Sequence, residues 1–113
     1  MSEPRQEGGF LMASYTDYRD FIKHKLDMRT LLEQLAEEAI ELSKASLKLI
    51  RAKGLSNNST PIAEQEAIQN LLEEVGDVMM VLTLLCSENK INIDIENNPK
   101  WKRWAERLGY VEE

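Results

Sequence analysis

The sequence predicts an all-α fold, a bundle of two long helices with shorter N- and C-terminal helices that is completed by oligomerisation. The chain has 113 residues, enough for one domain with a modest core. It holds five glycines and three prolines, and its apolar residues recur mainly at helical spacing, with little strand-like alternation. A helical chain of this size buries only part of its apolar surface, so we expect it to complete its core with further copies.

The N-terminal part is predicted to hold a tail and a first helix. Residues 1–9 are polar and are expected to form a flexible tail, which leaves residues 10–113 as a single helical domain. Thr16 is predicted to cap the first helix. Thr30 and Glu33 have the spacing of a capping box, which predicts either the start of a second helix or a nearly continuous passage into it. The apolar residues of the first helix recur at helical spacing: Tyr18, Phe21, Ile22 and Leu26.

The central part is predicted to hold the two long helices. The second helix is expected to run to Lys53, where Gly54 is a natural stop. The polar segment "GLSNNST" then predicts a loop. Thr60 and Pro61 form a typical N-cap and first-turn pair for a third helix, which is expected to continue to about residue 89.

The C-terminal part is predicted to form a loop and one short helix. The segment "KINIDIENN" alternates apolar and polar residues, but no partner strand is predicted elsewhere, so we interpret it as a loop. Asn98 and Pro99 are expected to open a helix over "KWKRWAERL", which ends at Gly109.

Two acid pairs lie on the predicted apolar stripes of the long helices. At about 100° per residue, Glu38 falls in the middle of its stripe and Glu41 lies about 60° to one side. Glu74 and Asp77 repeat this arrangement on the third helix. The apolar residues that share the two stripes are Leu31, Leu35, Leu42, Ala45 and Leu49 on the second helix and Leu71, Val78, Val81 and Leu85 on the third.

Four carboxylates facing a common apolar seam require neutralisation, because an unpaired buried carboxylate costs several kcal/mol and nearby like charges add to that cost. Neither stripe carries a central lysine or arginine, and Lys44 and Lys48 lie toward the flank of the second helix. A divalent metal ion is the other solution. Oxygen ligands without histidine or cysteine favour a hard cation, Mg²⁺ or Mn²⁺.

Charge and hydropathy exclude several partners and locations. The net charge of −6 disfavours non-specific binding to nucleic acid or to an anionic membrane. The longest apolar run, residues 75–86, is interrupted by Gly76 and Asp77 and is too short to span a bilayer. The single cysteine, Cys86, fits a reducing compartment, and the polar N-terminal segment lacks the apolar core of a signal peptide. We therefore predict a cytoplasmic protein.

The segments "EEAIE" (Glu37–Glu41) and "EVGD" (Glu74–Asp77) resemble the EExxE and ExxD motifs of the MazG-like all-α nucleoside triphosphate pyrophosphohydrolases. The resemblance covers about residues 20–108. It implies a helical protein that forms homodimers or homotetramers and uses Mg²⁺ to cleave a (d)NTP to the (d)NMP and pyrophosphate. Carried over residue by residue, it implies metal ligands at Glu38, Glu41, Glu74 and Asp77.

Cleavage of a phosphoanhydride needs neutralised phosphates, an aligned water and a stabilised leaving group. Glu41 or Glu37 is the candidate to accept the proton of the attacking water. Candidate phosphate-binding residues lie on the second helix and on the basic C-terminal helix, which resembles the family's basic stretch: Lys44, Lys48, Lys100, Arg103 and Arg107.

The alternative interpretation is a non-enzymatic helical interaction or adaptor module. It would explain the amphipathic helices, but it would leave the acids within the apolar stripes unexplained. A di-iron carboxylate bundle would need Glu-x-x-His motifs, and the only histidine, His24, lies outside both acid motifs.

Overall fold

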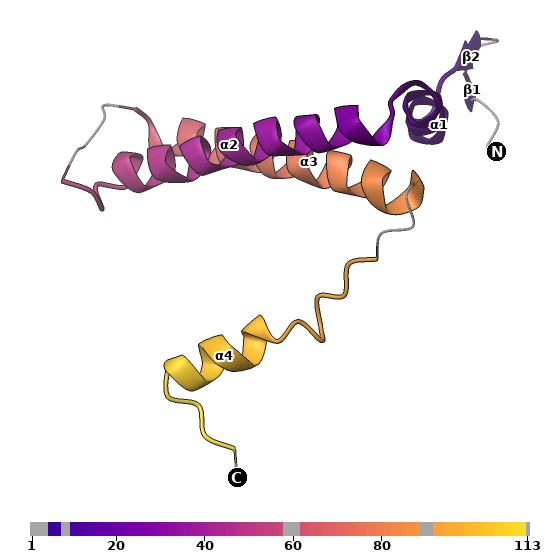
Figure 1. Ribbon diagram of the computed structural model, residues 1–113. Helices are drawn as coiled ribbons and strands as arrows, with labels where there is room; N and C mark the ends of the chain where they lie inside the picture. The colour runs from indigo at the N-terminus through magenta and orange to yellow at the C-terminus, as the bar shows by residue number, and fades with distance from the viewer. Residues whose placement is uncertain (1–4, 8–9, 58–61, 89–91, 113) are drawn as a thin grey trace.

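Two long antiparallel helices, α2 and α3, lie side by side and form the body of the molecule (Figure 1). Helix α1 crosses one end of this pair, and α4 stands apart from it. The predicted all-α class is confirmed. The bounds of the helices are α1 (Tyr15–Lys25), α2 (Met28–Ala52), α3 (Glu64–Glu88) and α4 (Lys100–Arg107). The computed structural model describes residues 5–7, 10–57, 62–88 and 92–112.

The core lies between α2 and α3, where the two predicted apolar stripes meet. Leu31 of α2 packs against three residues near the C-terminal end of α3, and Ile22 of α1 and Leu35 of α2 close the edges of this cluster. Fully burying a leucine contributes about 1.5–3 kcal/mol. Buried alanines lie farther along both helices and allow a close approach of the backbones. The buried apolar residues are Leu31, Ala45, Ala67, Val81, Leu84 and Leu85.

A short antiparallel ladder precedes the helices. Strand β1 (Arg5–Glu7) pairs with β2 (Phe10–Met12). A flexible tail is predicted over residues 1–9; residues 1–4 and 8–9 lie outside the described residues, and the remaining three form β1. An isolated two-stranded ladder contributes little stability, so the helices carry the fold.

The predicted cap of α1 at Thr16 is wrong, because Ser14 caps this helix instead. The Ser14 hydroxyl accepts from the Asp17 amide at 3.3 Å, and the Asp17 carboxylate accepts from the Ser14 amide at 2.9 Å. This reciprocal box needs an acceptor side chain three residues after the cap. A cap at Thr16 would place Arg19 there, and a guanidinium has no acceptor.

The predicted capping box of Thr30 and Glu33 is also wrong. Asp27 caps α2 by accepting from the Thr30 amide at 2.8 Å. Hydrogen bonds from the Thr30 side chain and, second, from its amide lower the pKa of Asp27. Glu33 instead accepts from Arg29 at 3.0 Å. Leu26 and Asp27 are both extended, so α1 and α2 are separate helices and the nearly continuous passage is excluded.

Both predicted glycine stops are confirmed. Gly54 has φ of +71° and Gly109 has φ of +103°, a backbone region that favours glycine. After α2, the Leu55 amide donates to the Ile50 carbonyl at 3.0 Å, and the Tyr110 amide donates to Ala105 at 2.9 Å after α4. This pattern satisfies the last carbonyls of each helix.

The connections agree with the sequence where they are described. Thr60 and Pro61, the predicted start of the third helix, lie outside the described residues, and α3 begins at Glu64. Residues 92–98 form neither helix nor strand, as predicted for this loop. α4 follows Pro99, and within the described residues it makes no close contact with another helix.

Candidate metal centre

Three acidic side chains from the two long helices converge at one point along the α2 and α3 seam. Glu38 comes from the middle of α2, and Glu74 and Asp77 come from successive turns of α3. One carboxylate oxygen from each residue lies within 4.8 Å of the other two. The acids meet because the stripes that carry them pack together, with Leu31 and Ala45 buried on either side of Glu38 along α2.

The environment of the cluster disfavours its negative charge. Glu38 and Glu74 are half-buried, and partial burial raises the pKa of Glu74 above its ordinary value of 4.5. The neighbouring carboxylates of Asp77, Glu38, Glu41 and Glu73 raise this pKa further, in that order. Within the part of the chain that the structure describes, no lysine or arginine forms an ion pair with the three clustered acids. The cluster is therefore a site where a cation would be stabilised.

Glu41 and Glu37, the other two acids of the first motif, do not join this group. The Glu41 carboxylate accepts from the Lys44 ammonium at 3.4 Å on an exposed face of α2. It remains close enough to the cluster to raise the pKa of Glu74. Glu37 is exposed. The structure thus brings together three of the four predicted metal ligands and leaves Glu41 at the edge.

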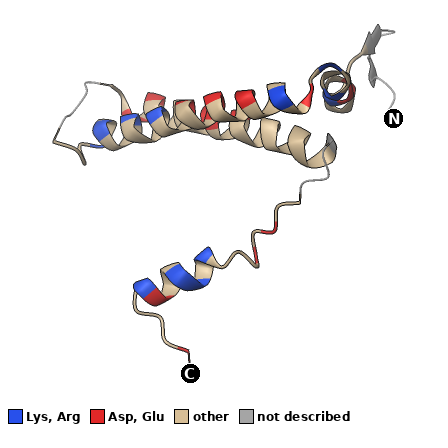
Figure 2. Cartoon of the chain, in the orientation of Figure 1, with Lys and Arg blue, Asp and Glu red and all other residues tan. Residues whose placement is uncertain are grey.

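The predicted phosphate-binding residues are dispersed within one chain. Lys44 is paired with Glu41, and Lys48 borders a shallow pocket with Glu66 and Glu73 on α3. Figure 2 shows the basic residues of α4 well away from the acidic stretch of α2 and α3. These α4 residues are Lys100, Arg103 and Arg107. A single chain does not place them beside the three clustered acids.

Sequence reasoning missed one residue of this site. The Gln34 side-chain amide donates to the Glu38 carboxylate at 2.9 Å, which fixes the orientation of that side chain. The sequence could have indicated this contact, because Gln34 lies four residues before Glu38 and side chains at this spacing are neighbours on one face of a helix.

The donor set and its geometry fit a hard divalent cation. All three groups offer oxygen, the ligand that Mg²⁺, Mn²⁺ and Ca²⁺ prefer. Opposite ligands of an octahedral Mg²⁺ lie about 4.2 Å apart, since each bond is about 2.1 Å long. Three ligands of one octahedral ion include at least two neighbouring pairs, which lie about 3 Å apart, so the clustered oxygens, all within 4.8 Å of one another, would draw closer together to bind one ion.

Comparisons of the chain with protein-family models, with curated proteins and with solved structures found no match. None of the helices within the described residues combines the length and apolar character that a bilayer crossing requires. The fold and the acidic cluster are thus the observations on which a function can be proposed.

Proposed function

We propose that this chain is a Mg²⁺-dependent nucleoside triphosphate pyrophosphohydrolase of the MazG-like type, converting a (d)NTP and water to the (d)NMP and pyrophosphate. The observation that carries the proposal is the convergence of Glu38, Glu74 and Asp77 from two packed helices. The same residues lie in the two segments that resemble the EExxE and ExxD motifs. The proposal includes a homo-oligomeric state and a cytoplasmic location, which the single cysteine fits.

The proposed cofactor site consists of Glu38, Glu74 and Asp77, with Glu41 as a fourth ligand reached by a side-chain rotation away from Lys44. Bound Mg²⁺ supplies charge neutralisation and Lewis acidity to the triphosphate. In the protein itself, Gln34 holds the Glu38 carboxylate through its 2.9 Å hydrogen bond.

The reaction needs a proton acceptor and cations for the departing pyrophosphate. Glu41, at the edge of the cluster, is the proposed acceptor for the proton of the attacking water, with Glu37 as the other candidate. Lys44 would be released from Glu41 to face the phosphates, and Lys48 lies one turn further along α2. The basic residues of α4 would complete this set only if the helix is brought to the cluster.

The proposal is tested by measuring pyrophosphate release over a panel of NTPs and dNTPs with Mg²⁺. Parent, Glu38→Gln and Glu33→Gln chains are compared. Glu33 is a matched control on the same helix, because its exposed carboxylate pairs with Arg29 away from the cluster. We expect the parent and Glu33→Gln to hydrolyse at least one substrate, and Glu38→Gln to lose at least about tenfold in rate. Equal rates for the parent and Glu38→Gln, or no release by the parent, would refute the proposal.

A further inference from the structure

The Glu38 carboxylate of the acidic cluster is held in place by a neighbouring side chain. The Gln34 side-chain amide donates to Oε1 of Glu38 at 2.9 Å. An ionised carboxylate only accepts hydrogen bonds, so the NH₂ group of Gln34 is the one that faces it. Within the described residues, neither Glu74 nor Asp77 has a side-chain hydrogen bond or an ion pair. The cluster therefore contains one oriented carboxylate and two that can rotate.

The corresponding position on α3 does not make this contact. Asn70 lies four residues before Glu74, just as Gln34 lies four residues before Glu38, and both amides are half-buried. Side chains at this spacing are neighbours on a helix. The asparagine side chain is shorter by one methylene, and in the part of the chain that the structure describes no hydrogen bond joins it to Glu74. The contact is thus particular to Gln34 and Glu38.

This hydrogen bond gives the two oxygens of Glu38 different roles. Oε1 accepts from Gln34, whereas Oε2 has no hydrogen-bond or ion-pair partner among the described residues. Hydrogen bonds to a charged acceptor are stronger than those between neutral groups. A rotation that turned both oxygens toward the cluster would break this bond. Glu38 is therefore set to offer a single oxygen to a cation.

Mg²⁺ and Ca²⁺ differ in how they use a carboxylate. Mg²⁺ requires near-octahedral geometry with bonds of about 2.1 Å, which places neighbouring ligands about 3 Å apart. The two oxygens of one carboxylate lie closer together than that, so Mg²⁺ takes one oxygen from each. Ca²⁺ takes about 6–8 oxygens at about 2.3–2.6 Å and accepts both oxygens of a carboxylate. A glutamate restricted to one oxygen suits the smaller ion.

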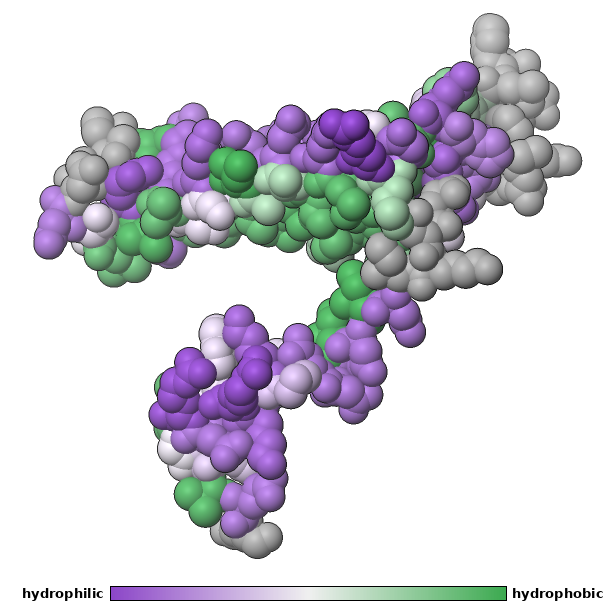
Figure 3. Space-filling model, in the orientation of Figure 1, coloured by the Kyte–Doolittle hydropathy of each residue, from purple (hydrophilic) through white to green (hydrophobic). Residues whose placement is uncertain are grey.

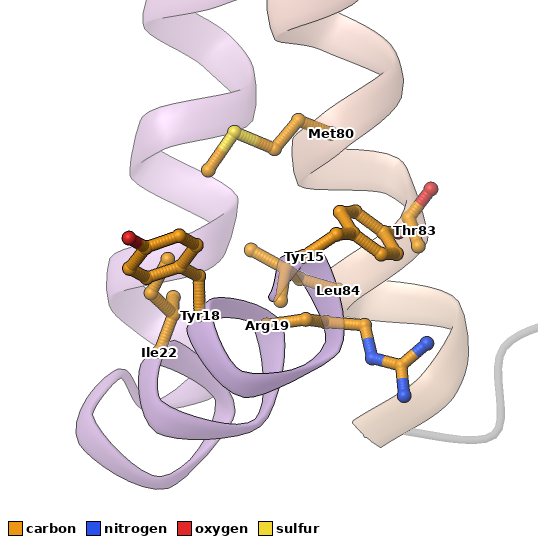
Figure 4. Close-up of a pocket in the computed structure, with 7 residues that line it drawn as sticks. All are labelled: Tyr15, Tyr18, Arg19, Ile22, Met80, Thr83 and Leu84. Carbon is orange, nitrogen blue, oxygen red and sulfur yellow. The ribbon is translucent and has the colours of Figure 1, made fainter. Parts of the chain in front are cut away.

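The surroundings of Asp77 add no further carboxylate to the cluster. One turn beyond it, Met80 lines a groove between α1 and α3 whose lining is almost wholly apolar. Figure 4 shows aromatic rings of α1 and the side chains of Met80 and Leu84 around this groove. Figure 3 shows a hydrophobic band that continues along the long helices. Second oxygens of the clustered acids are therefore the source from which a larger ion would fill its additional positions.

We propose that Gln34 is a positioning residue that sets the ion preference of the cluster, because it holds Glu38 to one metal bond and so favours Mg²⁺ over Ca²⁺. The inference rests on the proposed function, since it takes the cation site at Glu38, Glu74 and Asp77 as given. Without the amide, Glu38 loses more rotamer freedom when it binds Mg²⁺. Ca²⁺ binding is spared, because Glu38 can then offer both oxygens.

The test measures the affinity of the full chain for each ion by thermal melting. The parent and Gln34→Met are melted over a concentration series of MgCl₂ and of CaCl₂ at constant ionic strength, and the rise in melting temperature gives the dissociation constant. Methionine keeps an unbranched side chain but has no N–H donor. We expect the Mg²⁺ dissociation constant to rise about tenfold in Gln34→Met. The ratio of the Ca²⁺ to the Mg²⁺ dissociation constant should fall at least about fivefold.

Asn70→Leu is the matched control. It removes a half-buried amide from the corresponding position on α3 and keeps the branching of the side chain, but Asn70 makes no hydrogen bond to the cluster within the described residues. Its ratio of dissociation constants should stay within about twofold of the parent ratio. Circular dichroism checks that both variants keep the helical content of the parent. A purely structural role of Gln34 would weaken the binding of both ions equally and leave the ratio unchanged.

The outcomes separate this inference from the proposed function. An unchanged ratio in Gln34→Met, or the same fall in Asn70→Leu, would overturn the inference and leave the cation site standing. Mg²⁺ binding without pyrophosphate release would overturn the proposed reaction and leave the role of Gln34 to be decided by the ratio. A parent that binds neither ion would overturn both.

Discussion

Thermal stability in Mg²⁺ gives a direct test of the acidic cluster. The perturbation is Glu38→Gln, which keeps the size of the side chain and its contact with Gln34 but removes one of three clustered charges. In the parent, an Mg²⁺ site with a dissociation constant of about 1 mM would stabilise the fold by about 1.4 kcal/mol at about 10 mM metal. For a domain of this size that energy raises the melting temperature by roughly 5–10 °C.

The variant should lose most of this response. Loss of one of three charged ligands weakens metal binding by at least about tenfold, which reduces the stabilisation at about 10 mM Mg²⁺ to about 0.4 kcal/mol. That energy corresponds to a shift of roughly 2–3 °C. Without metal, Glu38→Gln should melt at or above the parent temperature at neutral pH, because the remaining acids repel one another less.

The assay is differential scanning calorimetry of the parent, Glu38→Gln and Glu33→Gln chains. Each is measured with MgCl₂ and with NaCl at matched ionic strength, so that general screening is subtracted. Glu33→Gln should keep the full Mg²⁺ response of the parent. The reasoning fails if the parent gains nothing from Mg²⁺ over NaCl, or if Glu38→Gln gains as much as the parent.

Three further predictions concern pH, the core and two glycines. Folding raises the pKa of Glu74, so without metal the free energy of unfolding of the parent falls as pH rises from 4.5 through that raised pKa. The melting temperature of Glu74→Gln should therefore lie above that of the parent at pH 7, and the two melting temperatures should converge near pH 4.5. Leu31→Ala should cost about 2–5 kcal/mol in urea unfolding, whereas Leu32→Ala, at an exposed position, should cost about 0.5 kcal/mol or less; equal costs would contradict the assigned core. Gly76→Ala should stabilise by about 0.5–1 kcal/mol, since the added methyl meets no atom within 4 Å. Gly54→Ala should destabilise the fold by about 1–2 kcal/mol because Gly54 has a positive φ. In thermal melts, Gly76→Ala should raise the melting temperature and Gly54→Ala should lower it, so changes in the same direction would refute the backbone assignment.

The helical spans could be predicted because helix formation follows a local pattern. The predicted apolar stripes of α2 and α3 include four of the buried residues, Leu31, Ala45, Val81 and Leu85, whereas Ala67 and Leu84 are buried without having been predicted. The stops at Gly54 and Gly109 follow from a backbone conformation that other residues avoid. The caps were harder to predict, because several polar residues precede each helix and the choice depends on which one finds a reciprocal partner. Ser14 has Asp17 three residues later, and Thr16 has no acceptor at that spacing.

The sequence by itself determined that acids would sit within apolar helix stripes, since 3.6 residues per turn fixes which side chains share a face. Tertiary structure alone decided which of them meet. The rotation and offset of α2 against α3 bring Glu38, Glu74 and Asp77 together and leave Glu41 beside Lys44. The position of α4 could likewise not be predicted from the sequence pattern. An amphipathic face predicts that a helix packs against a partner, but it does not specify which surface provides that partner. Relative placement of helices depends on packing between distant residues, and local periodicity does not encode it.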